Sequence, residues 1–129
     1  MIDLYTVATA NGQKVQILLE ETGLAYTPHL VDLHAGVHRQ PPFLAMNPFG
    51  RVPVIVDHEA GDLAVGETLA ILMYLAEKSG RFLPQDTRER SQVLQWLSAI
   101  SANFGPLFRG IFMFTSIVPG KSEPAIAYF

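Results

Sequence analysis

The order of strand-like and helix-like hydrophobic periods along the sequence constrains the fold of this chain more than any other feature. Residues 2–7 alternate large apolar residues with shorter ones, as a half-buried strand does, and residues 26–33 predict a second strand. Between them, residues 11–22 repeat apolar side chains every three to four positions and stop at Gly23, which predicts a helix. Because a helix that connects two strands makes a right-handed crossover, these two strands should be parallel.

The next two predicted strands are connected by a short turn and not by a helix. Residues 52–58 and 62–65 predict two further strands separated only by a short turn, so this pair should be antiparallel. Residues 67–78 follow as a helix. The apolar residues expected on its inner face are Leu69, Leu72, Met73, Leu75 and Ala76. The element order predicts the α/β class, with a thioredoxin-like βαβ-ββα domain over residues 1–80 and a mixed four-stranded sheet.

A second helical region begins at Asp86, which forms an acidic capping box with Glu89 three positions later. Apolar residues then recur at spacings of four and three, at Val93, Leu97, Ile100, Phe104, Phe108 and Ile111. Glycine and proline are unfavourable inside a helix, so we expect a kink or a break at Gly105-Pro106. Residues 86–129 should form a partial all-α domain that consists of this long helix and a tail.

The long helix is nearly free of charge. Charged residues make up 16% of the chain, against about 25% in a typical domain, and between Ser91 and Gly120 the only one is Arg109. The most apolar part, residues 104–118, is shorter than the ~20 residues of a membrane span. We therefore expect residues 91–120 to associate with a second chain, as a homodimer or a higher oligomer. The aromatic residues expected in that contact are Trp96, Phe104, Phe108 and Phe112.

Composition excludes several classes of function. The chain has no cysteine, which excludes a disulfide framework, a thiolate metal site and a protein-borne thiol nucleophile. A net charge of −3 disfavours nucleic acid as a partner. The four histidines lack metal-site spacing, and no phosphate-binding glycine motif is present. The acidic Asp3 stands where a signal peptide would be basic, so we expect a cytoplasmic protein.

Two motifs resemble a known family. They are Asn47-Pro48-Phe49-Gly50-Arg51-Val52-Pro53-Val54-Ile55-Val56-Asp57 and Gly66-Glu67-Thr68-Leu69-Ala70-Ile71-Leu72-Met73-Tyr74-Leu75-Ala76-Glu77-Lys78. Together they resemble the N-terminal half of soluble glutathione transferases, and the opening residues are most similar to the bacterial nu class. The resemblance implies glutathione as a bound co-substrate. Since chains of this family usually continue through several more helices, it also implies a helical domain that is cut short here.

The resemblance implies two anchors for glutathione, each of which has a second interpretation. Pro53 can simply begin a strand, or it can expose the Val52 backbone to an extended ligand; the family's proline at this position is cis. Glu67 and Thr68 can simply cap a helix, or they can bind the γ-glutamyl end of the ligand with backbone N–H groups, the threonine hydroxyl and the glutamate carboxylate. The family usually has serine in place of Thr68.

The remaining candidates concern the sulfur and the glycyl end of glutathione. Alone, Asn11 predicts a helix N-cap and Thr9 a turn residue; the resemblance implies that both donate hydrogen bonds that stabilise the thiolate. His38, Arg39 and Arg51 are typical solvated loop residues, and in this fold they would flank the glycyl carboxylate. Tyr5 carries a hydroxyl but lies inside a strand, which favours packing.

The resemblance implies a glutathione-dependent transferase or disulfide-bond reductase that acts on a small electrophile or disulfide. The alternative is a non-catalytic binding or dimerisation module with the same fold and a vestigial site. A detectable rate with a model electrophile or disulfide distinguishes the two.

Overall fold

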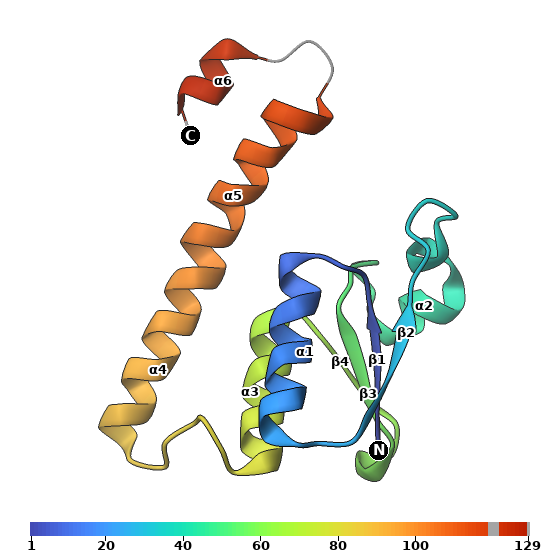
Figure 1. Ribbon diagram of the computed structural model, residues 1–129, viewed down its shortest axis with the longest axis vertical. Coiled ribbons are helices and arrows are strands. Elements are labelled where there is room, and N and C mark those ends of the chain that lie inside the picture. Colours follow the sequence, from blue (N-terminus) through green and yellow to red (C-terminus); the bar gives the residue numbers. More distant parts are fainter. Residues whose placement is uncertain (119–121, 129) are drawn as a thin grey trace. The chain divides into compact units, whose positions relative to one another are not determined.

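The computed structural model describes residues 1–118 and 122–128. The chain divides into two compact units, Met1–Leu83 and Pro84–Phe129 (Figure 1). The first unit contains the sheet and the helices packed on it. The described residues of the second form helices and the connections between them.

The sheet of the first unit has four strands in the order β2-β1-β3-β4. Their bounds are β1 (Ile2–Thr6), β2 (Tyr26–Leu30), β3 (Val54–Asp57) and β4 (Leu63–Gly66). β1 is parallel to β2 and antiparallel to β3, and β3 is antiparallel to β4. The predicted mixed sheet and thioredoxin-like α/β class are therefore confirmed. A 3₁₀ turn, η2 (His58–Ala60), connects β3 to β4.

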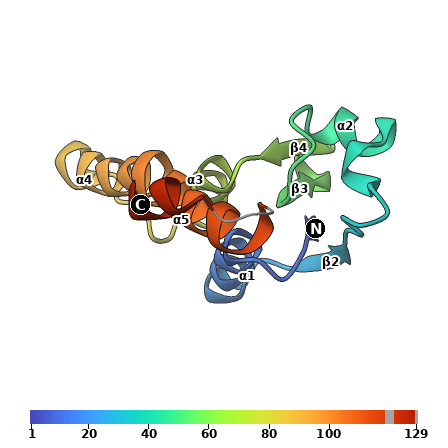
Figure 2. The same ribbon diagram turned by 90° about the horizontal axis from the view of Figure 1, so that it is seen from above.

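Two helices, α1 (Ala10–Thr22) and α3 (Thr68–Ser79), pack on one face of the sheet (Figures 1 and 2). Gly23 and Gly80 end them with positive φ angles of 72° and 66°, a conformation that glycine adopts without strain. The fully buried core between sheet and helices consists of Ile2, Leu4, Val15, Leu19, Ile55, Ile71 and Leu75.

A smaller cluster covers the other face of the sheet. It forms where α2 (Pro41–Met46), which follows the 3₁₀ turn η1 (Val37–Arg39), places Phe43 against Val31 and Val54. The ring of Tyr5 packs edge-on against Phe43 with centroids 6.5 Å apart. Tyr5 thus serves in packing, as its place inside a strand predicts.

The second unit is a long helical segment made of α4 (Thr87–Ala99), the π-helical turn η3 (Ile100–Phe104), α5 (Gly105–Phe112) and a second π-helical turn, η4 (Met113–Ile117). A short helix, α6 (Glu123–Tyr128), follows. The predicted cap is present, since Asp86 accepts a hydrogen bond from the Glu89 backbone N–H at 3.0 Å.

The long helix does not break at Gly105-Pro106. The Gly105 N–H donates to the Ile100 carbonyl, five residues back, so the turn before the proline widens into a π-helix. Such a turn accommodates a residue that lacks an N–H, because one backbone hydrogen bond of the regular ladder is omitted there. Among the described residues, no helix is long and apolar enough to cross a membrane.

Candidate functional site

Strand registers bring the predicted site segments to one end of the sheet. Tyr5, near the end of β1, pairs with Val54, the first residue of β3. Val54 in turn pairs with Gly66, the last residue of β4. The segments that follow β1, precede β3 and follow β4 therefore lie together. They contain Thr9, Asn11, Val52, Pro53, Glu67 and Thr68. The loop after the parallel strand β2 begins at the same end.

Thr9, not Asn11, is the N-cap of α1. The Thr9 hydroxyl oxygen accepts a hydrogen bond from the Gly12 N–H at 3.3 Å, while Asn11 lies within the first turn and accepts one from Lys14 Nζ at 3.1 Å. The expectation that Asn11 precedes the helix as its cap is therefore wrong. Its exposed side chain lies on the first turn, where the helix dipole favours an anion.

Gly12 brings this turn close to the strand. A Cβ atom at Gly12 would lie 2.2 Å from Thr6 Oγ1 and 2.5 Å from the Val7 carbonyl oxygen, so no larger residue fits. The absence of a side chain allows α1 to begin directly against the end of β1.

The peptide bond between Val52 and Pro53 is cis. Val52 is half-buried and stands outside the ladder of β3, which begins at Val54. Arg51, just before it, is exposed. The segment that leads into β3 forms one side of the site, the first limb. Its Val52 backbone can pair with an extended ligand.

Glu67 and Thr68 form the other limb. Glu67 has a φ of 63°, a region that side-chain-bearing residues rarely adopt and that is enriched at functional sites. No side chain caps the start of α3 within the described residues. The N–H groups of its first turn are thus available to an anion, as is the hydroxyl of Thr68, the first residue of the helix. Glu67 occupies the N-cap position of α3, as the cap interpretation predicts, but its side chain makes no capping hydrogen bond.

His38 and Arg39 lie in η1, and Arg39 Nε donates to His38 Nε2 at 3.3 Å. His38 is half-buried, and its Nδ1 is buried without a hydrogen-bond partner in the described part of the chain. Gly50 approaches the same turn, since a Cβ there would lie 3.0 Å from the His38 carbonyl oxygen. Arg39 is exposed.

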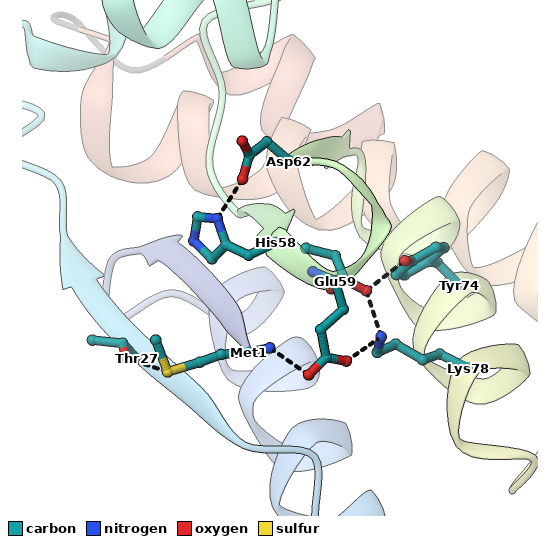
Figure 3. A network of polar contacts seen from close by, with 8 residues as sticks. Met1, Thr27, His58, Glu59, Asp62, Tyr74 and Lys78 are labelled. Carbon is teal, nitrogen blue, oxygen red and sulfur yellow. Dashed lines mark hydrogen bonds and ion pairs between the residues drawn. The ribbon is translucent and has the colours of Figure 1, made fainter.

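A polar network that the sequence did not predict surrounds Asp57, which is fully buried at the far end of β3. Asp57 accepts hydrogen bonds from Tyr74 Oη at 2.6 Å and the Glu59 N–H at 3.0 Å and pairs with Lys78 Nζ at 2.8 Å. Burial alone would raise the pKa of Asp57, but hydrogen bonds from Lys78 and Tyr74 outweigh it and lower that pKa. Glu59 joins Lys78 to the Met1 amino group (Figure 3).

This network lies away from the candidate site, because Asp57 pairs with Ile2 at the opposite end of the sheet. Its function is to join α3 to β3. The available sequence signal was the four-residue spacing of Tyr74 and Lys78, which places both on one face of a helix.

A second cluster on the surface contains two histidines and two aspartates. His58 Nδ1 lies 2.6 Å from Asp62 Oδ1, a contact that Figure 3 shows, and His58 Nε2 lies 3.1 Å from Asp3 Oδ2. The other carboxylate oxygen of Asp3, Oδ1, lies 3.1 Å from His29 Nε2. The hydrogen bonds to Asp62 and Asp3 raise the pKa of His58. Over the described residues, no group of three or more side chains is arranged to hold a metal ion.

Comparison with known proteins identifies the family. Residues 2–77 match the glutathione S-transferase N-terminal domain. The disulfide-bond oxidoreductase YfcG of Escherichia coli K12 is 46% identical over 111 residues, which cover 83% of this chain and 52% of that protein. The disulfide-bond oxidoreductase YghU of the same organism is 37% identical over 135 residues, covering 99% of this chain and 47% of that protein.

Solved structures agree. Ure2p in complex with glutathione superposes with a TM-score of 0.94 at 30% identity, over 98% of this chain and 61% of that one. A glutathione transferase family member from Pseudomonas fluorescens Pf-5 with two glutathione molecules bound gives 0.93 at 37% identity, over 98% and 58%. The chain spans about half the length of the curated relatives it matches. The predicted resemblance is confirmed, and the chain belongs to the glutathione transferase family.

Proposed function

We propose that the first unit binds glutathione at the end of the sheet where α1 and α3 begin. The observation that carries this proposal is the convergence of two limbs, the Val52 backbone before cis-Pro53 and the uncapped first turn of α3 after the strained Glu67. A strand-like backbone on one side and free N–H donors on the other are complementary to an extended peptide with a carboxylate at its end.

The two limbs assign the ends of the ligand. The γ-glutamyl carboxylate would accept hydrogen bonds from the first-turn N–H groups and the Thr68 hydroxyl, and Glu67 would pair with the α-ammonium group. The cysteinyl backbone would pair with Val52. His38, Arg39 or Arg51 would contact the glycyl carboxylate, since the loop after β2 and the turn before Val52 begin or end beside this site.

Thr9 and Asn11 would hold the sulfur. The Thr9 oxygen already accepts the Gly12 N–H, which leaves its own proton to donate, and Asn11 uses its oxygen on Lys14, which leaves its amide hydrogens. Two such donors, at a helix start, favour the thiolate over the thiol and lower the pKa of the ligand's sulfur. The chain has no cysteine, so the reacting sulfur must be that of glutathione.

The chemistry that fits is disulfide reduction or conjugation. The glutathione thiolate attacks one sulfur of a disulfide and expels the other as a thiolate. A second glutathione thiolate then attacks the glutathione sulfur of the mixed disulfide, which forms oxidised glutathione and expels the remaining substrate sulfur as a thiolate. In conjugation, the same thiolate adds to a small electrophile. Relatives named as disulfide-bond oxidoreductases support the first reaction.

The test is calorimetric titration with reduced and oxidised glutathione, followed by turnover of a small disulfide. We expect Asn11→Ala to reduce turnover more than binding, and the exposed Gln13→Ala to change neither. Absence of binding at millimolar glutathione contradicts the proposal. Binding without turnover instead supports the non-catalytic module, and an unchanged rate in Asn11→Ala removes Asn11 from the mechanism.

We also propose that the long helix is an association surface for a second copy of the chain. Trp96, Phe104, Phe108 and Phe112 recur at intervals of four or eight and are 65%, 52%, 64% and 57% exposed. The rings of Phe104 and Phe108 stack with centroids 6.4 Å apart. Between Ser91 and Gly120 the only charged residue is Arg109, so little charge is desolvated when two such stripes pack together. Residues 119 and 120 of the predicted contact lie outside the described residues.

Sedimentation velocity at micromolar concentration tests this association. We expect a dimer or larger species for the unmodified chain and a shift toward monomer for the double variant Phe104→Ser with Phe108→Ser. The matched control is Ile17→Ser, which replaces an apolar side chain of α1 that is 61% exposed. A monomeric unmodified chain contradicts the proposal.

A further inference from the structure

Asn47 lies between the two limbs of the proposed site and is 3% exposed. It follows directly after α2, and its backbone N–H donates to the Phe43 carbonyl at 2.9 Å. Its own carbonyl accepts from the Gly50 N–H at 2.9 Å. A buried polar side chain at such a position is costly unless its amide is fully used.

The amide of Asn47 closes the turn that leads into the first limb. Its Nδ2 donates to the Arg51 carbonyl at 2.8 Å, and its Oδ1 accepts from the Phe49 N–H at 3.1 Å. The residues that follow this turn are Val52 and cis-Pro53. One side chain therefore fixes the path of the backbone just before the position proposed to pair with glutathione.

The same amide contacts the second limb. A Cβ atom at Gly66 would lie 3.1 Å from Asn47 Cγ and Nδ2 and 3.4 Å from its Oδ1, tighter than ordinary packing. Gly66 is not among the glycines with positive φ, so the requirement at this position is space. Gly66 ends β4 and is followed by Glu67 and Thr68. The amide thus lies against the backbone that leads into the anion-binding turn.

We propose that Asn47 is a positioning residue of the glutathione site, whose buried amide sets the separation between the Val52 limb and the Glu67–Thr68 limb. This rests on the proposed function. A ligand that spans both limbs binds more tightly when their separation is fixed in advance, because no interaction energy is then used to order the site. Because Asn47 is 3% exposed, the proposed role is to position the two limbs and not to bind glutathione itself.

The test is a double-mutant cycle of Asn47→Ala and Gly66→Ala, with the dissociation constant of glutathione measured by calorimetry. Each single variant should weaken binding about tenfold, because each changes the separation of the limbs. The double variant should weaken it by less than the product, since loss of the amide makes room for the methyl group. Where Asn47→Ala does not fold, Asn47→Ser takes its place in the cycle.

The control is Tyr74→Phe, which removes the 2.6 Å hydrogen bond to Asp57 at the opposite end of the sheet. It should lower the thermal midpoint and leave the dissociation constant unchanged, so that lost stability and lost positioning are distinguished. Unchanged affinity in both single variants, or single effects that multiply, overturns the role of Asn47 alone. Failure of the unmodified chain to bind glutathione overturns this proposal together with the proposed function.

Discussion

Both units of the chain contain helices with similar apolar periods, but the apolar faces of these helices are buried to different degrees. In the first, α1 and α3 bury Val15, Leu19, Ile71 and Leu75 completely against the sheet. In the second, no described residue is buried: Trp96, Leu107 and Phe108 are exposed, and Leu94 and Leu97 are half-buried. The periodicity of a sequence thus shows which residues share a face of a helix, whereas burial also requires a partner for that face.

The largest difference between the units in the free energy of unfolding should come from truncating one leucine in each. Leu19 is 0% exposed and Leu107 is 39% exposed. Leu19→Ala should lower the free energy of unfolding of the first unit by about 3 kcal/mol, because it leaves a cavity, and Leu107→Ala that of the second by less than about 1 kcal/mol.

Each unit has its own reporter for this measurement. Amide hydrogen exchange in β1 and β3 reports the first unit, and fluorescence of Trp96, the single tryptophan, reports the second. Equal losses for the two variants would show that the second unit has a packed core of its own.

A second contrast comes from adding a methyl group. Gly12→Ala should lower the free energy of unfolding of the first unit by about 3 kcal/mol, because the new atom overlaps Thr6 and the Val7 backbone. Gly105→Ala is the matched change in the second unit, where the Cβ would lie 3.6 Å from the Ile100 carbonyl oxygen. Alanine there should stabilise the helix by about 0.5 to 1 kcal/mol. If urea denaturation shows an unchanged free energy of unfolding for Gly12→Ala, α1 can move away from the strand.

Much of the first unit could be predicted from local patterns. The periods of two and 3.6 residues and the stop signal at Gly23 indicated the order of the elements. The helical crossover and the short turn before residues 62–65 indicated the strand directions. The inner face of α3 was predicted less well. Leu75 and Ala76 are buried as predicted, and so is Ile71, which was not predicted. Leu69, Leu72 and Met73 are only half-buried. In an almost wholly apolar helix, periodicity cannot choose between adjacent faces.

The residues of the candidate site likewise divide into those that the sequence identified and those whose contacts only the structure shows. Residue types and motifs pointed to Val52, Pro53, Glu67 and Thr68, and the strand registers place them at one end of the sheet. The cap of α1 was assigned two residues late, because asparagine and threonine are both good caps and only the backbone path distinguishes them. The contact of Asn47 with Gly66 depends on tertiary packing, which no local pattern encodes.

The buried carboxylate of the first unit provides a third prediction. Asp57→Asn removes the charge that pairs with Lys78, and at pH 7 it should lower the free energy of unfolding by about 2 kcal/mol. The folded-state pKa of Asp57 is lowered, so its stabilisation is present above the unfolded-state pKa of about 4 and is lost as the pH falls through the folded value. The difference between the variant and the unmodified chain should therefore shrink below pH of about 4 in urea denaturation. A difference independent of pH would contradict the ion pair.

The smallest effect should come from the exposed histidine cluster of the first unit. Hydrogen bonds to Asp62 and Asp3 raise the folded-state pKa of His58, so its stabilisation is present below the unfolded value of about 6.5 and is lost as the pH rises through the folded one. His58→Gln should abolish this decline in the urea midpoint, whereas His34→Gln, in the exposed loop after β2, should retain it. A decline that persists in His58→Gln would contradict the assignment to His58. The second unit has no histidine, so the Trp96 signal should show no change in this pH range from either substitution.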